Sequence, residues 1–123
     1  MSYKRIAIAD RSVLAHNVYE TLLKPEGYSL FPYQTLKELK EHLHFDWGIQ
    51  LLLVSSNTFG KYFDQHYKWF LKEKGPCRTA KIFLCETGEK KWAGALKKLP
   101  KSQIVWKPFY PPELEEKISR IAG

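Results

Sequence analysis

Five short apolar runs, each followed by an amphipathic stretch, constrain the fold of this 123-residue chain more than any other feature. The runs cover residues 5–9, 28–33, 51–54, 81–85 and 103–106. Runs of this length without polar alternation are typical of strands covered on both faces, as in a parallel sheet. Strands that alternate with helices predict a doubly wound α/β domain, a five-stranded parallel sheet between two layers of helices.

Apolar residues repeat at helical spacing between and after these runs. In the first such stretch Leu14, Val18 and Leu22 recur every four residues, so we expect them to form the buried face of a helix capped by Ser12. A third helix is expected over residues 61–72, and Gly75-Pro76 should break it. The buried faces of the later helices are predicted from Leu36, Leu39 and Leu43; Phe63, Tyr67 and Phe70; Trp92, Leu96 and Leu99; and Leu114, Ile118 and Ile121.

The second apolar run contains a proline. Pro32 has no N–H to donate to a strand ladder, so the run at 28–33 should lie at an edge of the sheet.

Size and composition favour one compact domain over residues 1–123, since 44% of the residues are hydrophobic. No apolar stretch approaches 18 residues and no signal-peptide core follows the N-terminus, so we expect a cytoplasmic protein without a membrane span. Cys77 and Cys85 are expected to be free thiols. His42 and His44 have no second pair of ligands, so no zinc site is expected.

Positive charge is concentrated in the second half of the chain. Residues 61–107 hold 12 Lys and Arg against 4 Asp and Glu, whereas the whole chain has a net charge of +7. Such a region would attract an acidic protein, a nucleic acid or an anionic membrane surface, or would simply be a solvated lysine-rich face. We favour the solvated face because the lysines show no regular interleaving with aromatic residues.

Polar side chains follow four of the apolar runs directly. Asp10, Ser55, Glu86 and Lys107 stand at these ends, and the carboxyl ends of parallel strands form the usual ligand site of such sheets. Lys107 is followed by Pro108 and Phe109. With this ending and the five alternating runs, the chain resembles a response-regulator receiver domain (CheY-like) over residues 4–122. The resemblance implies the strand order 2-1-3-4-5, which agrees with the edge position expected from Pro32.

The resemblance also implies a phosphorylation pocket. In such domains two acids after the first strand and an acceptor aspartate after the third hold Mg²⁺, while a lysine after the fifth strand neutralises the phosphoryl oxygens. This chain keeps the first acid as Asp10 and the lysine as Lys107. It has Arg11 at the second acidic position and Ser55 at the acceptor position.

Two further positions complete the comparison. Asn57 stands where a backbone carbonyl would contact the metal, and Glu86 stands at the Thr or Ser position after the fourth strand, with Thr87 adjacent. Shifting the third strand by one residue only exchanges one serine for another, Ser56. Asp46 and Asp64 lie too far from the strand end to replace the acceptor.

We therefore predict a pseudo-receiver with a vestigial pocket, no catalytic residue, no cofactor and weak or no Mg²⁺ binding. Two interpretations of the substituted charges stay open. In one, an internal ion-pair network replaces the metal and phosphate, with Glu86 beside Lys107 and with Asp10 beside Arg11 and near Lys107. In the other, Arg11 and Glu86 point to solvent.

For function, the resemblance implies protein–protein interaction or dimerisation through the face of the fourth helix, fifth strand and fifth helix, and we expect no enzyme activity. Trp92, Trp106, Phe109 and Tyr110 are the candidate contact residues, because aromatic residues are enriched at interaction hot spots. Core packing is the alternative for each; for Trp106 both are equally expected, and for Phe109 burial is favoured.

Two other functions are kept as alternatives. One is a phosphoacceptor receiver of a two-component phosphorelay, and the other is a basic nucleic-acid-binding module, for which no reader motif is present. Residues 1–123 are either a complete single-domain protein or the N-terminal part of a longer regulator.

Overall fold

The computed structural model describes residues 4–46, 48–72 and 76–122. Its five strands form one parallel sheet in the order β2-β1-β3-β4-β5. The fold class, the strand order and the edge position of the strand that contains Pro32 are therefore confirmed. The strands are β1 (Arg5–Ala9), β2 (Ser29–Tyr33), β3 (Leu51–Ser55), β4 (Ala80–Glu86) and β5 (Ser102–Lys107).

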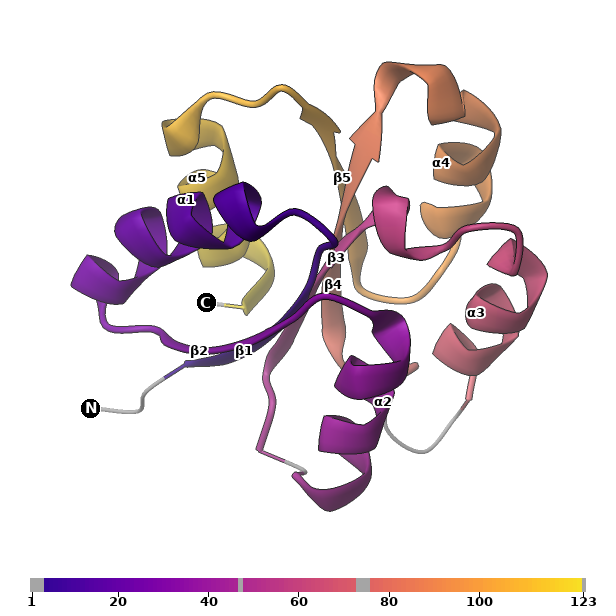
Figure 1. The fold of residues 1–123 in the computed structure, drawn as a ribbon, viewed down its shortest axis with the longest axis horizontal. Coiled ribbons are helices and arrows are strands. Elements are labelled where there is room, and N and C mark those ends of the chain that lie inside the picture. The colour runs from indigo at the N-terminus through magenta and orange to yellow at the C-terminus, as the bar shows by residue number, and fades with distance from the viewer. Residues whose placement is uncertain (1–3, 47, 73–75, 123) are drawn as a thin grey trace.

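Helices cover both faces of the sheet (Figure 1). The α-helices are α1 (Val13–Leu23), α2 (Leu36–Phe45), α3 (Phe63–Phe70), α4 (Lys90–Leu96) and α5 (Pro111–Ala122), and the short 3-10 turns are η1 (Lys24–Glu26), η2 (Ser56–Thr58) and η3 (Thr87–Glu89). None of the helices within the described ranges has the length and apolar character needed to cross a bilayer.

Two apolar cores, one on each face of the sheet, follow from the alternation of side chains along each strand. Ile6 and Ile8 of β1 point into the core under α1 and α5. Ala7 and Ala9 point the other way, into the core under α2, α3 and α4. All five residues of β3 are buried, as expected for the central strand.

The inward face of α1 differs from the prediction. Leu14 and Val18 were expected to be buried, but they are 77% and 46% exposed, and Tyr19 and Leu23 are buried instead. The stripe Ala15–Tyr19–Leu23 has the same four-residue spacing as the predicted one and lies beside it on the helix. This stripe faces the sheet, where Tyr19 and Leu23 pack into the core and the phenol of Tyr19 donates a 2.6 Å hydrogen bond to the buried carboxylate of Asp10. The wrong prediction leaves Val13, Leu14 and Val18 as an exposed apolar strip.

Smaller differences concern element ends. Helix α3 is shorter at both ends than the predicted range 61–72, after Gly60 with a positive φ of 56°. Leu99 is buried but lies in the turn after α4 rather than within the helix. The predicted break at Gly75-Pro76 lies partly outside the described residues. Ser12 caps α1 as predicted, through the N–H of Ala15.

A buried lysine joins two loops at the amino end of β4. Lys81 is fully buried, and its ammonium group donates to the carbonyl oxygens of Thr79 at 2.7 Å, Pro100 at 2.8 Å and Cys77 at 3.2 Å. Three carbonyls satisfy the three protons of an ammonium group. Burial lowers the pKa of Lys81 from the ordinary 10.5 to about 8, and repulsion from Lys101 contributes.

This shift predicts an alkaline stability effect. Between pH 8 and 10.5 the unfolded chain holds a proton at Lys81 that the folded chain has released, so the free energy of unfolding should rise with pH over that window. We expect wild type to gain about 1–3 kcal/mol relative to Lys81→Met between pH 7 and pH 10, measured by urea unfolding. Lys61→Met is the exposed control. Equal pH dependence of wild type and Lys81→Met would contradict the assignment.

Candidate functional site

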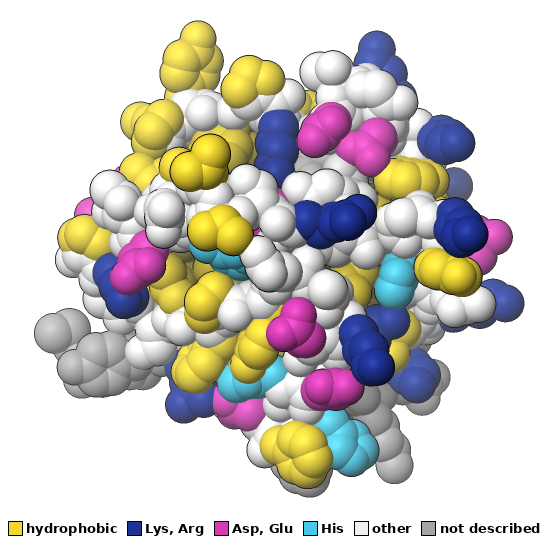
Figure 2. All heavy atoms as spheres, in the orientation of Figure 1, with side chains coloured by type: hydrophobic (Ala, Val, Ile, Leu, Met, Phe, Trp, Pro, Cys, Tyr) yellow, Lys and Arg dark blue, Asp and Glu magenta, His cyan; other side chains and the backbone are white. Residues whose placement is uncertain are grey.

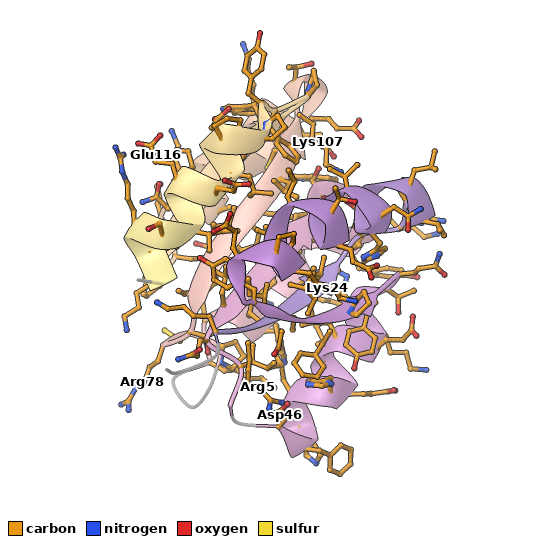
Figure 3. The ribbon with its side chains drawn as sticks, turned by 90° about the vertical axis from the view of Figure 1, so that its left-hand side faces the viewer. Arg5, Lys24, Asp46, Arg78, Lys107 and Glu116 are labelled. Atoms are coloured by element: carbon orange, nitrogen blue, oxygen red, sulfur yellow. The ribbon has the colours of Figure 1, made fainter. Side chains whose placement is uncertain are left out.

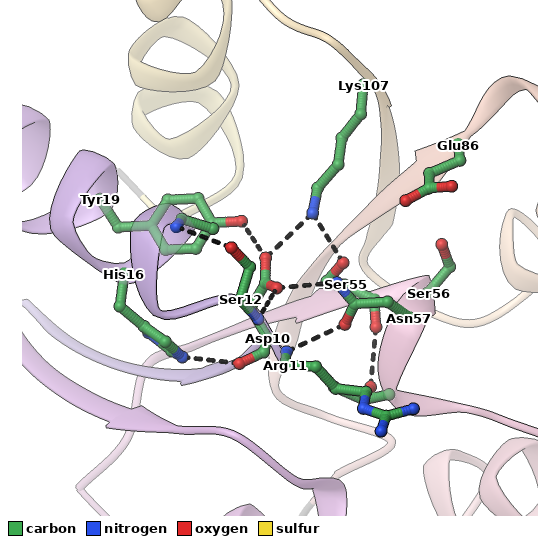
Figure 4. A network of polar contacts seen from close by, with 12 residues as sticks. Asp10, Arg11, Ser12, His16, Tyr19, Ser55, Ser56, Asn57, Glu86 and Lys107 are labelled. Atoms are coloured by element: carbon green, nitrogen blue, oxygen red, sulfur yellow. Dashed lines mark hydrogen bonds and ion pairs between the residues drawn. The ribbon is translucent and has the colours of Figure 1, made fainter.

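The carboxyl ends of β1, β3 and β5 bring together Asp10, Ser55 and Lys107, at one end of the sheet (Figure 4). Lys107 donates to Asp10 Oδ2 at 3.0 Å and to Ser55 Oγ at 2.9 Å. Asp10 is fully buried and Ser55 almost so, whereas the lysine side chain is 20% exposed. The structure therefore places a closed ion pair where the resemblance implies a metal and a phosphoryl group.

The carboxylate of Asp10 has no free lone pair. Its Oδ1 accepts from the N–H of Ser12 at 2.9 Å and from the amide of Asn57 at 2.8 Å. Its Oδ2 accepts from Tyr19 at 2.6 Å as well as from Lys107. An ionised carboxylate has about four acceptor sites, so these donors fill it.

The same donors set the protonation of this cluster. Burial alone would raise the pKa of Asp10, but hydrogen bonds from Asn57, Tyr19, the Ser12 N–H and Lys107 outweigh it and hold the pKa below its ordinary 3.8. Burial and the neighbouring Asp10 carboxylate raise the pKa of the Tyr19 phenol well above 10. Asp10 is therefore ionised and Tyr19 protonated at neutral pH.

Asn57 and His16 connect the cluster to the rest of the sheet edge. Asn57 uses its carbonyl to accept from the backbone N–H of Arg11 at 3.0 Å, so it bridges η2 and the end of β1. His16 Nε2 lies 2.8 Å from the carbonyl oxygen of Asp10 and 3.0 Å from that of Tyr33. Since both partners only accept, the proton is on Nε2, and the ring ties α1 to β1 and β2.

Arg11 and Glu86 are both exposed, and no ion pair joins either of them to Lys107 or Asp10 within the described residues. The expected pair of Glu86 with Lys107 is therefore wrong, the expected position of Asp10 near Lys107 is confirmed, and Arg11 and Glu86 are exposed as the other interpretation expected. Although Glu86 pairs with Lys107 in the sheet register, its side chain turns to η3 and caps the backbone N–H of Glu89. Asp10 is the partner because its carboxylate is the one buried beside the ammonium.

The turn that follows β3 at Ser56 is held by a second set of hydrogen bonds, separate from those of Asp10. Ser56 is buried and donates to the carboxylate of Glu89, which also accepts from the backbone N–H of Glu86 at 3.0 Å. The contacts join the end of β3 to the turn after β4. Neither Ser55 nor Ser56 offers a free hydroxyl to solvent.

A Mg²⁺ site does not fit this arrangement. Magnesium requires several hard oxygen ligands in near-octahedral geometry. The lone pairs of Asp10 are taken, Arg11 occupies the second acidic position, and Ser55 accepts from an ammonium group. In the part of the chain that the structure describes, no three His, Cys, Asp or Glu side chains gather in a group suited to a metal ion.

Of the four predicted contact aromatics, Tyr110 alone is strongly exposed, at 81%. Trp92 stacks on Phe63 with ring centroids 5.2 Å apart and an interplanar angle of 4°, so it belongs mainly to the core. Trp106 is partly buried against the core under α2, α3 and α4, and Phe109 against the core under α1 and α5.

Sequence reasoning missed two members of the cluster, Tyr19 and His16, because the buried face of α1 was assigned from Leu14, Val18 and Leu22 alone. The signal available was that His16 and Tyr19 stand about one helical turn apart, on the helix that directly follows Asp10. The role of the Asn57 side chain was also missed, because the resemblance implied only a backbone role at that position.

The ion pair predicts a stability difference between two acidic residues. Asp10→Asn should lower the free energy of unfolding by about 2–4 kcal/mol at pH 7, because it leaves Lys107 without an anion. Glu86→Gln, which keeps an acceptor for the cap, should cost under about 0.5 kcal/mol. Chemical unfolding of both variants measures this difference.

The pH dependence of the same variants checks the mechanism. Because the folded pKa of Asp10 is lowered, its contribution is present above its unfolded pKa and is lost as the pH falls through the folded pKa. The gap between wild type and Asp10→Asn should therefore close in acid. A gap that is constant down to pH about 2 would show that Asp10 acts only through packing.

No protein-family model matches the chain, and no curated protein sequence matches it. Solved structures do match. A response regulator receiver protein from Pseudomonas putida superimposes with a TM-score of 0.82 at 15% identity, over 98% of each chain. A CheY-like receiver domain from Methanospirillum hungatei JF-1 gives 0.79 at 21% identity, over 97% of this chain and 93% of that one. A receiver protein from Sinorhizobium medicae WSM419 gives 0.79 at 16%, over 98% and 95%. The chain therefore has the fold of a response-regulator receiver domain.

Proposed function

We propose that this chain is a receiver-like signalling module that works without phosphorylation, through contact with a protein partner or with a second copy of itself. The observation that carries the proposal is the saturated carboxylate of Asp10, which neutralises Lys107 inside the protein. In a phosphorylated receiver the lysine neutralises the phosphoryl oxygens. Here Lys107 is already paired with Asp10, so its charge is not available to a phosphoryl group. We assign it no catalytic activity and place its action in the cytoplasm.

Ser55 does not supply a substitute nucleophile. A serine hydroxyl needs a neighbouring base to become reactive. The Lys107 ammonium donates a hydrogen bond to Ser55 Oγ at 2.9 Å and is paired with Asp10, so it is a donor to this hydroxyl and not a base for it. Because Ser55 is also buried, a phosphodonor has no path to it. These contacts argue against the alternative of a phosphoacceptor in a phosphorelay.

We expect wild type to gain no phosphoryl mass when it is incubated with a small-molecule phosphodonor and Mg²⁺. Ser55→Asp should also stay unmodified, because Arg11 opposes a cation and Asp10 has no lone pair to offer one. The triple variant Arg11→Asp, Ser55→Asp, Glu86→Thr is the smallest set for which we expect any label. Intact-mass analysis before and after hydroxylamine gives the readout. Hydroxylamine-labile or acid-stable phosphate on wild type would refute the proposal.

For the interaction surface we propose the face formed by α4, β5 and α5, with Tyr110 at its centre. Tyr110 is highly exposed and lies beside the half-buried Phe109 in the turn between β5 and α5. The exposed strip of Val13, Leu14 and Val18 on α1 adjoins this turn, and Figure 2 shows apolar side chains gathered over α1 and the start of α5. Aromatic and apolar groups that stay in water in the free domain are the ones that gain most from burial by a partner.

The self-association form of the proposal predicts a reversible dimer that depends on Tyr110. Sedimentation velocity over about 5–500 μM should show concentration-dependent dimerisation, and Tyr110→Ser should weaken it by at least about tenfold. Tyr62→Ser is the matched control, because Tyr62 is 53% exposed and lies directly before α3, outside the elements of this face. Equal effects of both variants would reject this face, and a monomer at every concentration would leave a different protein as the partner.

A further inference from the structure

A groove of about 900 Å³ lies at the amino ends of β4 and β5, the end of the sheet opposite the Asp10–Lys107 pair. In Figure 3 Arg78, which lines it, lies at the end of the molecule away from Lys107. The groove takes no part in the proposed function above, and the inference drawn from it is independent of that function.

Four cations from separate segments converge on this groove. They are Arg78 before β4, Lys97 after α4, Lys101 before β5, and Arg120 in α5. Among the described residues no carboxylate lines the groove, and Arg120 alone of the four forms an ion pair, 2.6 Å to Glu116 on the outside of α5. Like charges without anions between them give a concave site with a strong positive potential.

The two loops that carry Arg78 and Lys101 are fixed to each other. The buried ammonium of Lys81 donates to Thr79 on one loop and Pro100 on the other. Lys101 has a positive φ of 53°, a backbone conformation that a lysine rarely adopts. The backbone N–H of Lys81 donates to the Lys101 carbonyl at 2.8 Å, which holds the turn in place. The cations are therefore attached to a braced rim, not to free loops.

The floor of the groove is apolar. Ile49, Ala80 and Leu99 line it and are less than 8% exposed, and the polar side chains of Gln50 and Gln103 stand beside them. A site with an apolar floor, a few polar groups and several cations suits a small molecule with an organic body and more than one phosphate group.

We propose that this groove binds a nucleotide with at least two phosphate groups. The phosphates would contact Arg78, Lys97 and Lys101, with the organic body over Leu99. A membrane surface is disfavoured, since among the described residues none of the large exposed apolar side chains lies on the groove, and such binding depends on inserting them. A nucleic acid is disfavoured, since the described part of the lining holds no aromatic side chains on which successive bases would stack.

The test uses ATP without Mg²⁺, AMP and inorganic pyrophosphate as probes, followed by titration calorimetry at low salt. We expect saturable binding of ATP, at least about tenfold tighter than AMP, and weakening as salt screens the cations. Arg78→Gln with Lys101→Asn should weaken ATP binding by at least about tenfold; asparagine is chosen because it tolerates positive φ. The matched control is Lys61→Gln with Lys91→Asn, which removes the same charge at exposed positions outside the groove.

Amide NMR shifts of wild type locate the site without any variant. Shifts that cluster at residues 78–81 and 97–103 support the proposal, and shifts that cluster around Asp10 and Lys107 overturn it. Failure of ATP to saturate at about 5 mM, or equal losses in the groove and control variants, also overturns it. Duplex DNA and phosphatidylserine vesicles are the remaining arms. Tighter binding of either than of ATP, with the same sensitivity to Arg78 and Lys101, would replace the nucleotide with that ligand.

Discussion

The buried carboxylate of Asp10 is the interaction on which this end of the molecule depends. Its four acceptor positions are filled by four donors: the Ser12 N–H directly before α1, Tyr19 in α1, Asn57 in η2 and Lys107 in β5. Filling them has two consequences. It holds the charge of Asp10 in the folded state, which would otherwise be costly to bury. It also holds each donor in place. Tyr19 ties α1 to the site, Asn57 ties η2 to it, and Lys107 also donates to Ser55.

This arrangement pairs the charges of Asp10 and Lys107 within the protein itself. In such a pocket the cation of Lys107 needs an anion, because a lysine near a buried strand end without a partner destabilises the fold. Asp10 supplies that anion at 3.0 Å, and the Ser55 hydroxyl adds a neutral acceptor at 2.9 Å. One negative and one positive charge therefore remain, which balance each other. Glu86, free of the pocket, caps η3 instead.

The sequence was sufficient to predict the sheet, but it did not predict the buried face of α1, the helix that borders the site. Runs such as residues 51–54 are buried on both faces, so their apolar continuity alone identifies strands, and Pro32 identifies the edge. Helix α1 carries two adjacent stripes with equal spacing, one through Leu14 and one through Tyr19. Apolarity favours the first, yet the structure buries the second, in which Leu23 packs into the core and Tyr19 donates to Asp10. The spacing of apolar residues does not show that a polar side chain on the same helix bonds to a buried carboxylate.

The candidate site, too, could be predicted only in part from the sequence. The order of the runs and the residues that follow them were enough to place Asp10, Ser55 and Lys107 at one end of the sheet, because the carboxyl ends of parallel strands lie together there. The choice between Asp10 and Glu86 as the partner of Lys107 was not available from register, because Glu86 is the direct neighbour on β4, whereas Asp10 follows β1 and two strands, β3 and β4, lie between β1 and β5. Burial decides it: the fully buried carboxylate gains more from an ammonium than the exposed one, which water already solvates. At the opposite end of the sheet no carboxylate of the described residues lines the groove. Of the 12 Lys and Arg in residues 61–107, Arg78, Lys97 and Lys101 line that groove, whereas Lys107 is paired with Asp10 in the pocket.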